Sequence, residues 1–161
     1  HHEQPSYMRT ARNKVPRAYS EETASQLTIG KGFVHRTGSD VAIIACGVML
    51  NEALEAADQL LKSGVHAAVV DMHTIKPLDT DLVCKLAKEC GAIVTAEDHS
   101  IIGGLGGAVA ECIVSEHPVP LERVGVQDRF GESGGSDELL KMLNMKADDI
   151  VIAANRAIAR R

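Results

Sequence analysis

The chain has 161 residues, of which 45% are hydrophobic and 2% aromatic, and its formal net charge is −5. This length suits one compact domain, whose core must be built from Val, Ile, Leu and Ala because Trp is absent. The acidic balance excludes an electrostatic basis for binding nucleic acid or an anionic membrane. No apolar run reaches the length of a bilayer span and no signal peptide opens the sequence, so we expect a cytoplasmic protein.

Residues 1–32 lack a complete core pattern, and we expect them to be the end of a preceding unit followed by a linker. His1 and His2 fit a purification-tag remnant or a native sequence equally well. The segment also carries a basic cluster, formed by Arg9, Arg12, Lys14 and Arg17. These cations suit a solvated linker, or a surface whose guanidinium groups bind phosphate.

From residue 33 onward, short strands alternate with helical patterns. A strand is expected at 33–36, and four further strands, spaced by roughly one βαβ unit each, are predicted at 41–46, 67–72, 92–96 and 121–126. Between them, Gly64 and Gly91 are placed to end helices, and Asp79 or Thr80 to begin one. Ser136 is expected to cap a short helix, and a last helix contains Ile150 to Ile158. This order predicts a mainly parallel five-stranded sheet with helices on both faces, a three-layer α/β/α sandwich.

Polar residues follow the strand at 92–96, where open α/β sheets usually meet ligands or partners. Glu97, Asp98 and His99 are expected in a turn, and the glycine cluster 103–107 then opens a helix. The cluster is neither a dinucleotide-binding nor a Walker motif, so it indicates either close helix packing or an anion at the helix N-terminus. Asp98, His99 and Ser100 are neighbours in sequence, which excludes a hydrolase triad because triad members come from separate segments.

A candidate metal site, one polar loop and the four cysteines are weaker indications of function. Asp71, His73 and His99 follow neighbouring strands and could converge on a metal, although nothing in their spacing demands it. The loop at 128–134, with its charges, Phe130 and glycines, suits an interdomain loop or a solvated turn equally well. The four cysteines form no C-x-x-C pair and are expected to be buried free thiols in a reducing compartment. They are Cys46, Cys84, Cys90 and Cys112.

Taken in order and spacing, three stretches resemble the C-terminal domain of transketolase. They are residues 41–54 (VAIIACGVMLNEAL), residues 70–79 (VDMHTIKPLD) and residues 95–99 (TAEDH) with the following Gly103-Gly-Leu-Gly106. The TIKPLD and EDH motifs favour transketolase over its relatives, the 2-oxoacid dehydrogenase E1 β subunits and deoxyxylulose-phosphate synthase. The resemblance extends from about Tyr7 to the end. It implies a mixed sheet, a boundary that assigns 1–32 to the end of a pyrimidine domain plus linker, and a C-terminal domain at 33–161.

This resemblance also implies an activity for a larger enzyme. Transketolases of the pentose phosphate pathway transfer a two-carbon ketol unit between sugar phosphates, using thiamine diphosphate and a divalent metal (Mg or Ca). In that family the cofactor and metal are bound by a pyrophosphate domain and a pyrimidine domain across a homodimer interface. Neither of those domains is recognisable in these 161 residues. The piece is therefore expected to be inactive alone, to bind no cofactor or metal itself, and to serve domain packing and dimer contacts.

The resemblance carries few site residues onto this sequence. No catalytic residue is transferred. Arg12 stands where transketolases bind the substrate phosphate, with Arg9 as the alternative if the alignment shifts. Glu97, Asp98 and His99 are the candidates for interdomain or dimer contacts. Two other readings remain: a free-standing α/β binding module with an anion at residues 103–107, and the C-terminal domain of a related thiamine enzyme.

Overall fold

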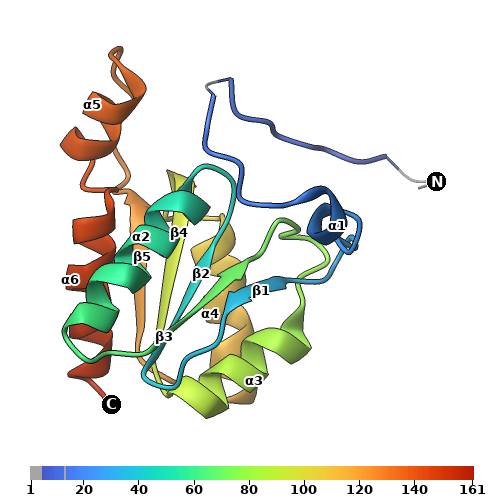
Figure 1. The fold of residues 1–161 in the computed structure, drawn as a ribbon, viewed down its shortest axis with the longest axis vertical. Helices are drawn as coiled ribbons and strands as arrows, with labels where there is room; N and C mark the ends of the chain where they lie inside the picture. The colour runs from blue at the N-terminus through green and yellow to red at the C-terminus, as the bar shows by residue number, and fades with distance from the viewer. Residues whose placement is uncertain (1–4, 13) are drawn as a thin grey trace.

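The computed structural model describes residues 5–12 and 14–161, so His1 and His2 lie outside the described residues. Figure 1 shows a single twisted sheet between two layers of helices. Its strand order is β1-β3-β2-β4-β5, with β1 antiparallel to β3 and the other pairs parallel. The strands are β1 (Phe33–Arg36), β2 (Val41–Ala45), β3 (Ala67–Asp71), β4 (Ile93–Ser100) and β5 (Leu121–Val126). The mixed five-stranded α/β architecture predicted from the sequence is confirmed.

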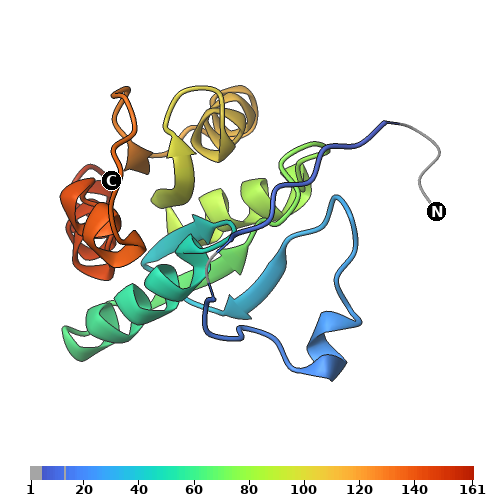
Figure 2. The same cartoon turned by 90° about the horizontal axis from the view of Figure 1, so that it is seen from above.

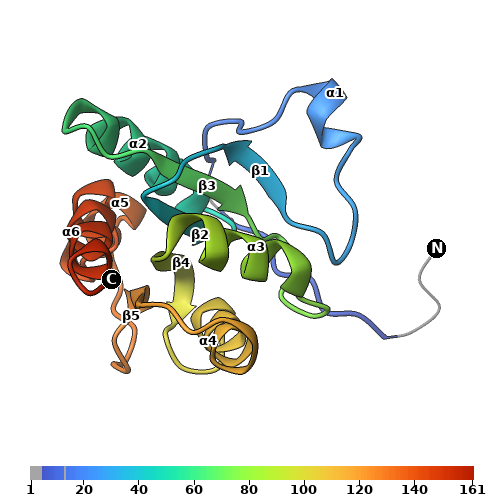
Figure 3. The ribbon, with the colours of Figure 1, turned by 90° about the horizontal axis from the view of Figure 1, so that it is seen from below.

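In the described part of the chain, six helices accompany the strands. They are α1 (Glu21–Ala24), α2 (Met49–Lys62), α3 (Thr80–Cys90), α4 (Leu105–Glu116), α5 (Ser136–Met142) and α6 (Ala147–Ile158). Seen from below, α2 and α6 cover one face of the sheet while α3 and α4 cover the other (Figure 3). The parallel strands therefore have helices on both sides, as connections that run βαβ require.

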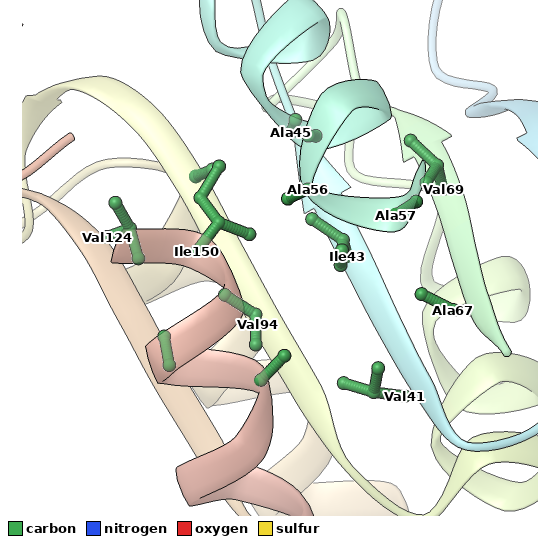
Figure 4. Packing of buried hydrophobic residues seen from close by; sticks show 14 of the residues in the cluster. Val41, Ile43, Ala45, Ala56, Ala57, Ala67, Val69, Val94, Val124 and Ile150 are labelled. Atoms are coloured by element: carbon green, nitrogen blue, oxygen red, sulfur yellow. The ribbon is translucent and has the colours of Figure 1, made fainter. Parts of the chain in front are cut away.

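The core lies on both faces of the sheet. Ile43 of β2 packs in the cluster under α2 and α6, together with Val69, Val94 and Ile150 (Figure 4). Its neighbour Ile44 belongs to the cluster under α3 and α4. Every residue of β2 is fully buried, which explains why its sequence is a continuous apolar run with no alternating polar side.

Most helix ends follow the sequence pattern. Asp79 caps α3, where its carboxylate accepts a hydrogen bond from the Leu82 amide at 3.3 Å. Gly64 and Gly91 follow α2 and α3 with φ of +82° and +66°, a conformation that favours glycine. The expected cap at Ser136 is wrong, because Ser136 is already the first residue of α5 and Gly135 occupies the N-cap.

Strand β4 is longer than its sequence indicates. The apolar run ends at Ala96, but the strand continues to Ser100, so Glu97, Asp98 and His99 lie in the strand and not in a turn. The ladder with β5 is interrupted between Ala96 and Ser100. The polar end of the strand is thus an extension of the sheet beyond its buried part.

The N-terminal segment, residues 5–12 and 14–32, has no strand and a single four-residue helix, α1. Seen from above, it runs across the end of the sheet at which the parallel strands finish (Figure 2). Tyr7 and Met8 are 90% and 83% exposed. Within the described part of the chain, no helix is both long and apolar enough to cross a membrane.

Candidate functional site

The candidate site is the carboxyl edge of the sheet, defined here by Cys46, Asp71, Glu97, Asp98 and His99. These residues follow or end the three central parallel strands, which are in register at Ala45, Asp71 and Ala96. The Cys46 amide donates to the Ala96 carbonyl at 3.1 Å, which joins the end of β2 to β4 at the residue before Glu97. The edge therefore gathers polar groups from distant parts of the sequence, as parallel topology predicts.

Glu97 is directed inward, with 1% of its surface exposed. Its two carboxylate oxygens accept hydrogen bonds from the amides of Leu105 and Gly106, each at 2.7 Å. These amides belong to the first turn of α4, whose N-cap residue is Gly104 and has no side chain to offer. The carboxylate thus satisfies two amide donors and lies at the positive end of the helix dipole.

The glycine cluster is explained by this arrangement. A Cβ at Gly104 would overlap the Glu97 carboxylate, and one at Gly106 would lie 2.9 Å from Thr95 Oγ1. Close packing of α4 against β4 is therefore what these two glycines permit. The alternative of an external anion at residues 103–107 is not supported, because the chain's own carboxylate already occupies that helix end.

Asp98 and His99 are directed outward, with 44% and 51% of their side chains exposed. The His99 ring Nδ1 lies 2.8 Å from the Ser100 carbonyl, while Asp98 is bound by Arg9. Asp98, His99 and Ser100 do not form a hydrogen-bonded triad. Of the three predicted contact residues, Asp98 and His99 present their side chains to solvent. Glu97 is buried and contacts the first turn of α4.

Arg9 joins the N-terminal segment to the edge. Its guanidinium donates to the Asp98 carbonyl and to the Asp98 carboxylate, both at 2.6 Å. The alternative phosphate ligand is thus already paired. Arg12 is exposed three positions further along. The sequence indicated both arginines but gave no sign of the pairing, which links residues 89 positions apart.

A second anchor, which the sequence did not indicate, lies beneath the end of β3. The Tyr19 hydroxyl donates to Asp71 Oδ2 at 2.5 Å, and its ring contacts those of Phe33 and His35. Burial and the hydrogen bond to Asp71 raise the pKa of Tyr19. Burial lowers the pKa of His35, partly opposed by the Asp71 charge. Within the described residues, His35 Nε2 and Asp71 Oδ1 are buried without a hydrogen-bond partner.

The proposed convergence of Asp71, His73 and His99 on a metal is not supported. Among residues 5–12 and 14–161, no three His, Cys, Asp or Glu side chains are grouped so that they could hold a metal ion. Asp71 instead accepts the Tyr19 hydroxyl, and His73 Nδ1 lies 3.0 Å from Thr74 Oγ1. Asp71 and His73 are thus engaged with neighbouring side chains and are not grouped with His99.

Comparison with known proteins assigns most of the chain to one family. The family model described as "Transketolase, C-terminal domain" matches residues 30–150, which include the whole sheet. The chain belongs to this family. The match begins three residues before β1, so the anchors Arg9 and Tyr19 precede the matched region.

Two transketolase subunits similar to this chain are about twice its length. The chain is 45% identical over 160 residues to the 6-deoxy-6-sulfo-D-fructose transketolase subunit of Clostridium sp. (strain MSTE9), covering 99% of this chain and 49% of that protein. It is 37% identical over 147 residues to an apulose-4-phosphate transketolase subunit of Phocaeicola vulgatus, covering 91% of this chain and 46% of that protein.

A solved structure extends the comparison to the fold. "Split gene transketolase, inactive beta4 tetramer" superposes with a TM-score of 0.89 at 44% identity, covering 93% of this chain and 49% of that one. The 1-deoxy-D-xylulose-5-phosphate synthase of Stutzerimonas stutzeri is 38% identical over 160 residues, covering 99% of this chain and 24% of that enzyme. The transketolase resemblance drawn from the sequence is confirmed, and the transketolase C-terminal domain spans about half the length of its first relatives.

Proposed function

We propose that this chain acts as the C-terminal section of an enzyme that transfers a two-carbon ketol unit between sugar phosphates. The observation that carries the proposal is coverage: nearly all of this chain matches about half of a transketolase subunit. The missing half would supply the catalytic and cofactor-binding residues, so the section is inactive alone. Its four free cysteines favour a reducing compartment, and we extend the proposal to a cytoplasmic enzyme of the pentose phosphate pathway.

The proposal places thiamine diphosphate and its Mg or Ca ion on the rest of the enzyme. The residues described here offer no grouped set of three metal ligands, so no chemical step is assigned to them. Their role is to shape and hold the assembly. The carboxyl edge presents the Asp98 and His99 side chains, and the N-terminal segment presents Tyr7 and Met8. Exposed aromatic and methionine side chains are typical of protein contacts, which supports docking against a pyrimidine domain in a homodimer.

The test mixes this C-terminal section with the separately encoded section that carries the other transketolase domains. If one gene encodes both sections, the test uses that single long chain. Ketol transfer between pentose phosphates in the presence of thiamine diphosphate is the expected activity. A second candidate, deoxyxylulose-phosphate synthase, is favoured by 38% identity to such an enzyme over nearly the whole chain. Condensation of pyruvate with glyceraldehyde phosphate, without pentose phosphate turnover, would replace the first proposal by the second.

Arg12 is the proposed ligand of the substrate phosphate. Its guanidinium is exposed and suited to bidentate contact with a phosphate, whereas Arg9 is bound to Asp98. Hydrogen bonds to charged groups contribute about 1.5–3 kcal/mol, so Arg12→Ala should raise KM for phosphorylated sugars roughly ten- to a hundredfold. Steady-state kinetics with phosphorylated and unphosphorylated substrates measures this. The control is Arg17→Ala, another exposed arginine of the segment; equal KM changes for both substrate classes would contradict the assignment.

Asp98 is the proposed contact residue that can be tested most directly. Reversing its charge by Asp98→Lys should weaken assembly of the complete enzyme, because a rim charge would then oppose its partner. Sedimentation velocity measures the loss of the assembled species. The same change breaks the pair with Arg9, so Arg9→Ala is the matched control that removes this pair alone. Sedimentation unchanged by Asp98→Lys would exclude Asp98 from the interface.

A further inference from the structure

Two cysteines face each other across the seam between α3 and α4. Cys84 lies on α3 and Cys112 on α4, and their sulfur atoms are 3.8 Å apart. Both side chains are half-buried, and the two helices lie next to each other on one face of the sheet (Figure 3). Cys46 and Cys90 are elsewhere, at the carboxyl edge and beside the Gly38 carbonyl. One pair of thiols is therefore singled out by its geometry.

We propose that Cys84 and Cys112 form a reversible disulfide, a redox modification site that joins α3 to α4. A disulfide has a sulfur–sulfur distance of about 2.05 Å, so the two sulfurs need to approach by under 2 Å. Rotation of the two cysteine side chains about χ1 is the movement by which the sulfurs would approach. The cysteines are 28 residues apart in sequence, so the bond would close a loop that contains the whole of β4.

The surroundings allow a small oxidant to reach the pair. Cys84 and Cys112 line an open groove of about 670 Å³ between the helices, together with Lys85, Lys88 and Ser115. The groove is also lined by the carboxylates of Asp81, Glu89, Glu111 and Glu116, so its charged groups are of both signs and do not favour an anionic reagent. Among the described residues, no third His, Cys, Asp or Glu joins the two thiols in a group that could hold a metal ion. The geometry thus favours a dithiol–disulfide couple over a metal site.

The reaction consumes one molecule of a low-molecular-weight disulfide, such as oxidised glutathione. The thiolate of one cysteine, having lost its proton to solvent, attacks a sulfur of the oxidant and releases one glutathione thiolate. The second cysteine, also deprotonated, attacks the mixed disulfide, forms the Cys84–Cys112 bond and releases the second glutathione. Two electrons pass from the protein dithiol to the oxidant, which is reduced to two thiols. A small thiol such as dithiothreitol reverses both steps.

The rate should be slow near neutral pH. Burial and the hydrogen bond with Cys84 raise the pKa of Cys112 to about 11, which keeps its sulfur protonated and poorly nucleophilic. Raising the pH toward that value increases the thiolate fraction and should accelerate the exchange. The pair would therefore respond to sustained oxidation and not to brief exposure.

The test uses the reduced full chain, treated with oxidised glutathione at pH 8 and then alkylated to trap free thiols. The expected result is the loss of two of the four free thiols and a peptide pair that joins Cys84 to Cys112 in the mass spectrum. Trypsin alone leaves Cys90 and Cys112 in one peptide, from Glu89 to Arg123. A protease that cleaves after glutamate separates them at Glu97 and Glu111, so the linkage is assigned without ambiguity.

Matched variants decide the outcome. Cys84→Ser should leave Cys112 carrying glutathione, because no second thiol resolves the mixed disulfide. The double variant with Cys46→Ser and Cys90→Ser should still form the link and lose both of its thiols. It tests the proposal even if Cys84→Ser fails to fold. Glutathione retained on both Cys84 and Cys112 in the double variant, or neither thiol reacting after prolonged oxidation at pH 9, would overturn the proposal.

Discussion

The sheet and the N-terminal segment of residues 5–32 are held in place in different ways. The central strands are fixed by aliphatic side chains buried on both faces, with Ile43 and Ile44 fully inaccessible to solvent. The segment leaves Tyr7 and Met8 exposed and is attached mainly through polar groups, Arg9 to Asp98 and Tyr19 to Asp71. The central strands therefore resist changes of pH and salt, while the attachment of the segment depends on them.

This difference indicates that the segment can move when another domain docks, while the sheet stays rigid. A segment held by a few directional contacts is readily repositioned when another domain docks on it, because each surface ion pair contributes only about 0–1 kcal/mol. The sheet beneath offers a rigid platform at its carboxyl edge. Substitutions of core and segment residues can measure how far the two regions differ.

The largest effect is expected in the sheet. Ile43→Ala removes a side chain that packs between α2, α6 and the neighbouring strands, and such truncations cost about 2–5 kcal/mol in the free energy of unfolding. Urea denaturation of the full chain measures it. Tyr7→Ala, in the exposed part of the segment, is the control and should change the value by less than about 0.5 kcal/mol. Similar losses for both would remove the distinction between the regions.

An intermediate effect is expected at the buried anchor of the segment. Tyr19→Phe deletes the hydroxyl that donates to Asp71 and leaves a carboxylate without its donor, at a cost of about 1–3 kcal/mol. The same denaturation experiment measures it, with Tyr7→Phe as a control that removes an exposed hydroxyl. A loss no greater than in the control would mean that the Tyr19 hydroxyl does not fix the segment.

The smallest effect is a pH dependence at the same anchor. The pKa of His35 is lower in the folded protein than its ordinary value near 6.5, so the folded state disfavours protonation of this ring. The stability from the neutral ring is complete above pH 6.5 and is lost as the pH falls from there through the folded pKa. Unfolding measured between pH 7.5 and 5.5 should show this decline, and His35→Asn should make it shallower. An unchanged slope would exclude His35 as its source.

Features dictated by local sequence were predictable. Continuous apolar runs located β2 and β3, since strands buried on both faces exclude polar residues. Strand β5, which contains Glu122 and Arg123, was located by its spacing from the strand before it. Gly64, Gly91 and Asp79 marked helix ends through backbone conformation and side-chain capping. The order and spacing of these elements then gave the sheet and its family.

Features that depend on distant partners were not predictable. The polar end of β4 suggested a turn because nothing near Glu97 in sequence shows that its carboxylate accepts the amides of Leu105 and Gly106. Tyr19 lies within the segment expected to be a linker, and its partner Asp71 is 52 positions away in the chain. The pairing of Arg9 with Asp98 was hidden for the same reason. Such contacts follow from the folded geometry and leave no periodic signature in the sequence.

The cap that Glu97 provides has a consequence for the order of folding. An isolated helix of 12 residues is marginal in water, and the N-cap residue of α4, Gly104, makes no side-chain capping hydrogen bond. Its first turn is completed by a carboxylate from the adjacent strand, so this helix gains stability only after β4 has been placed. Helix α3, whose cap Asp79 is local, has no such requirement. We expect α3 to develop early in folding, and α4 to become ordered together with the centre of the sheet.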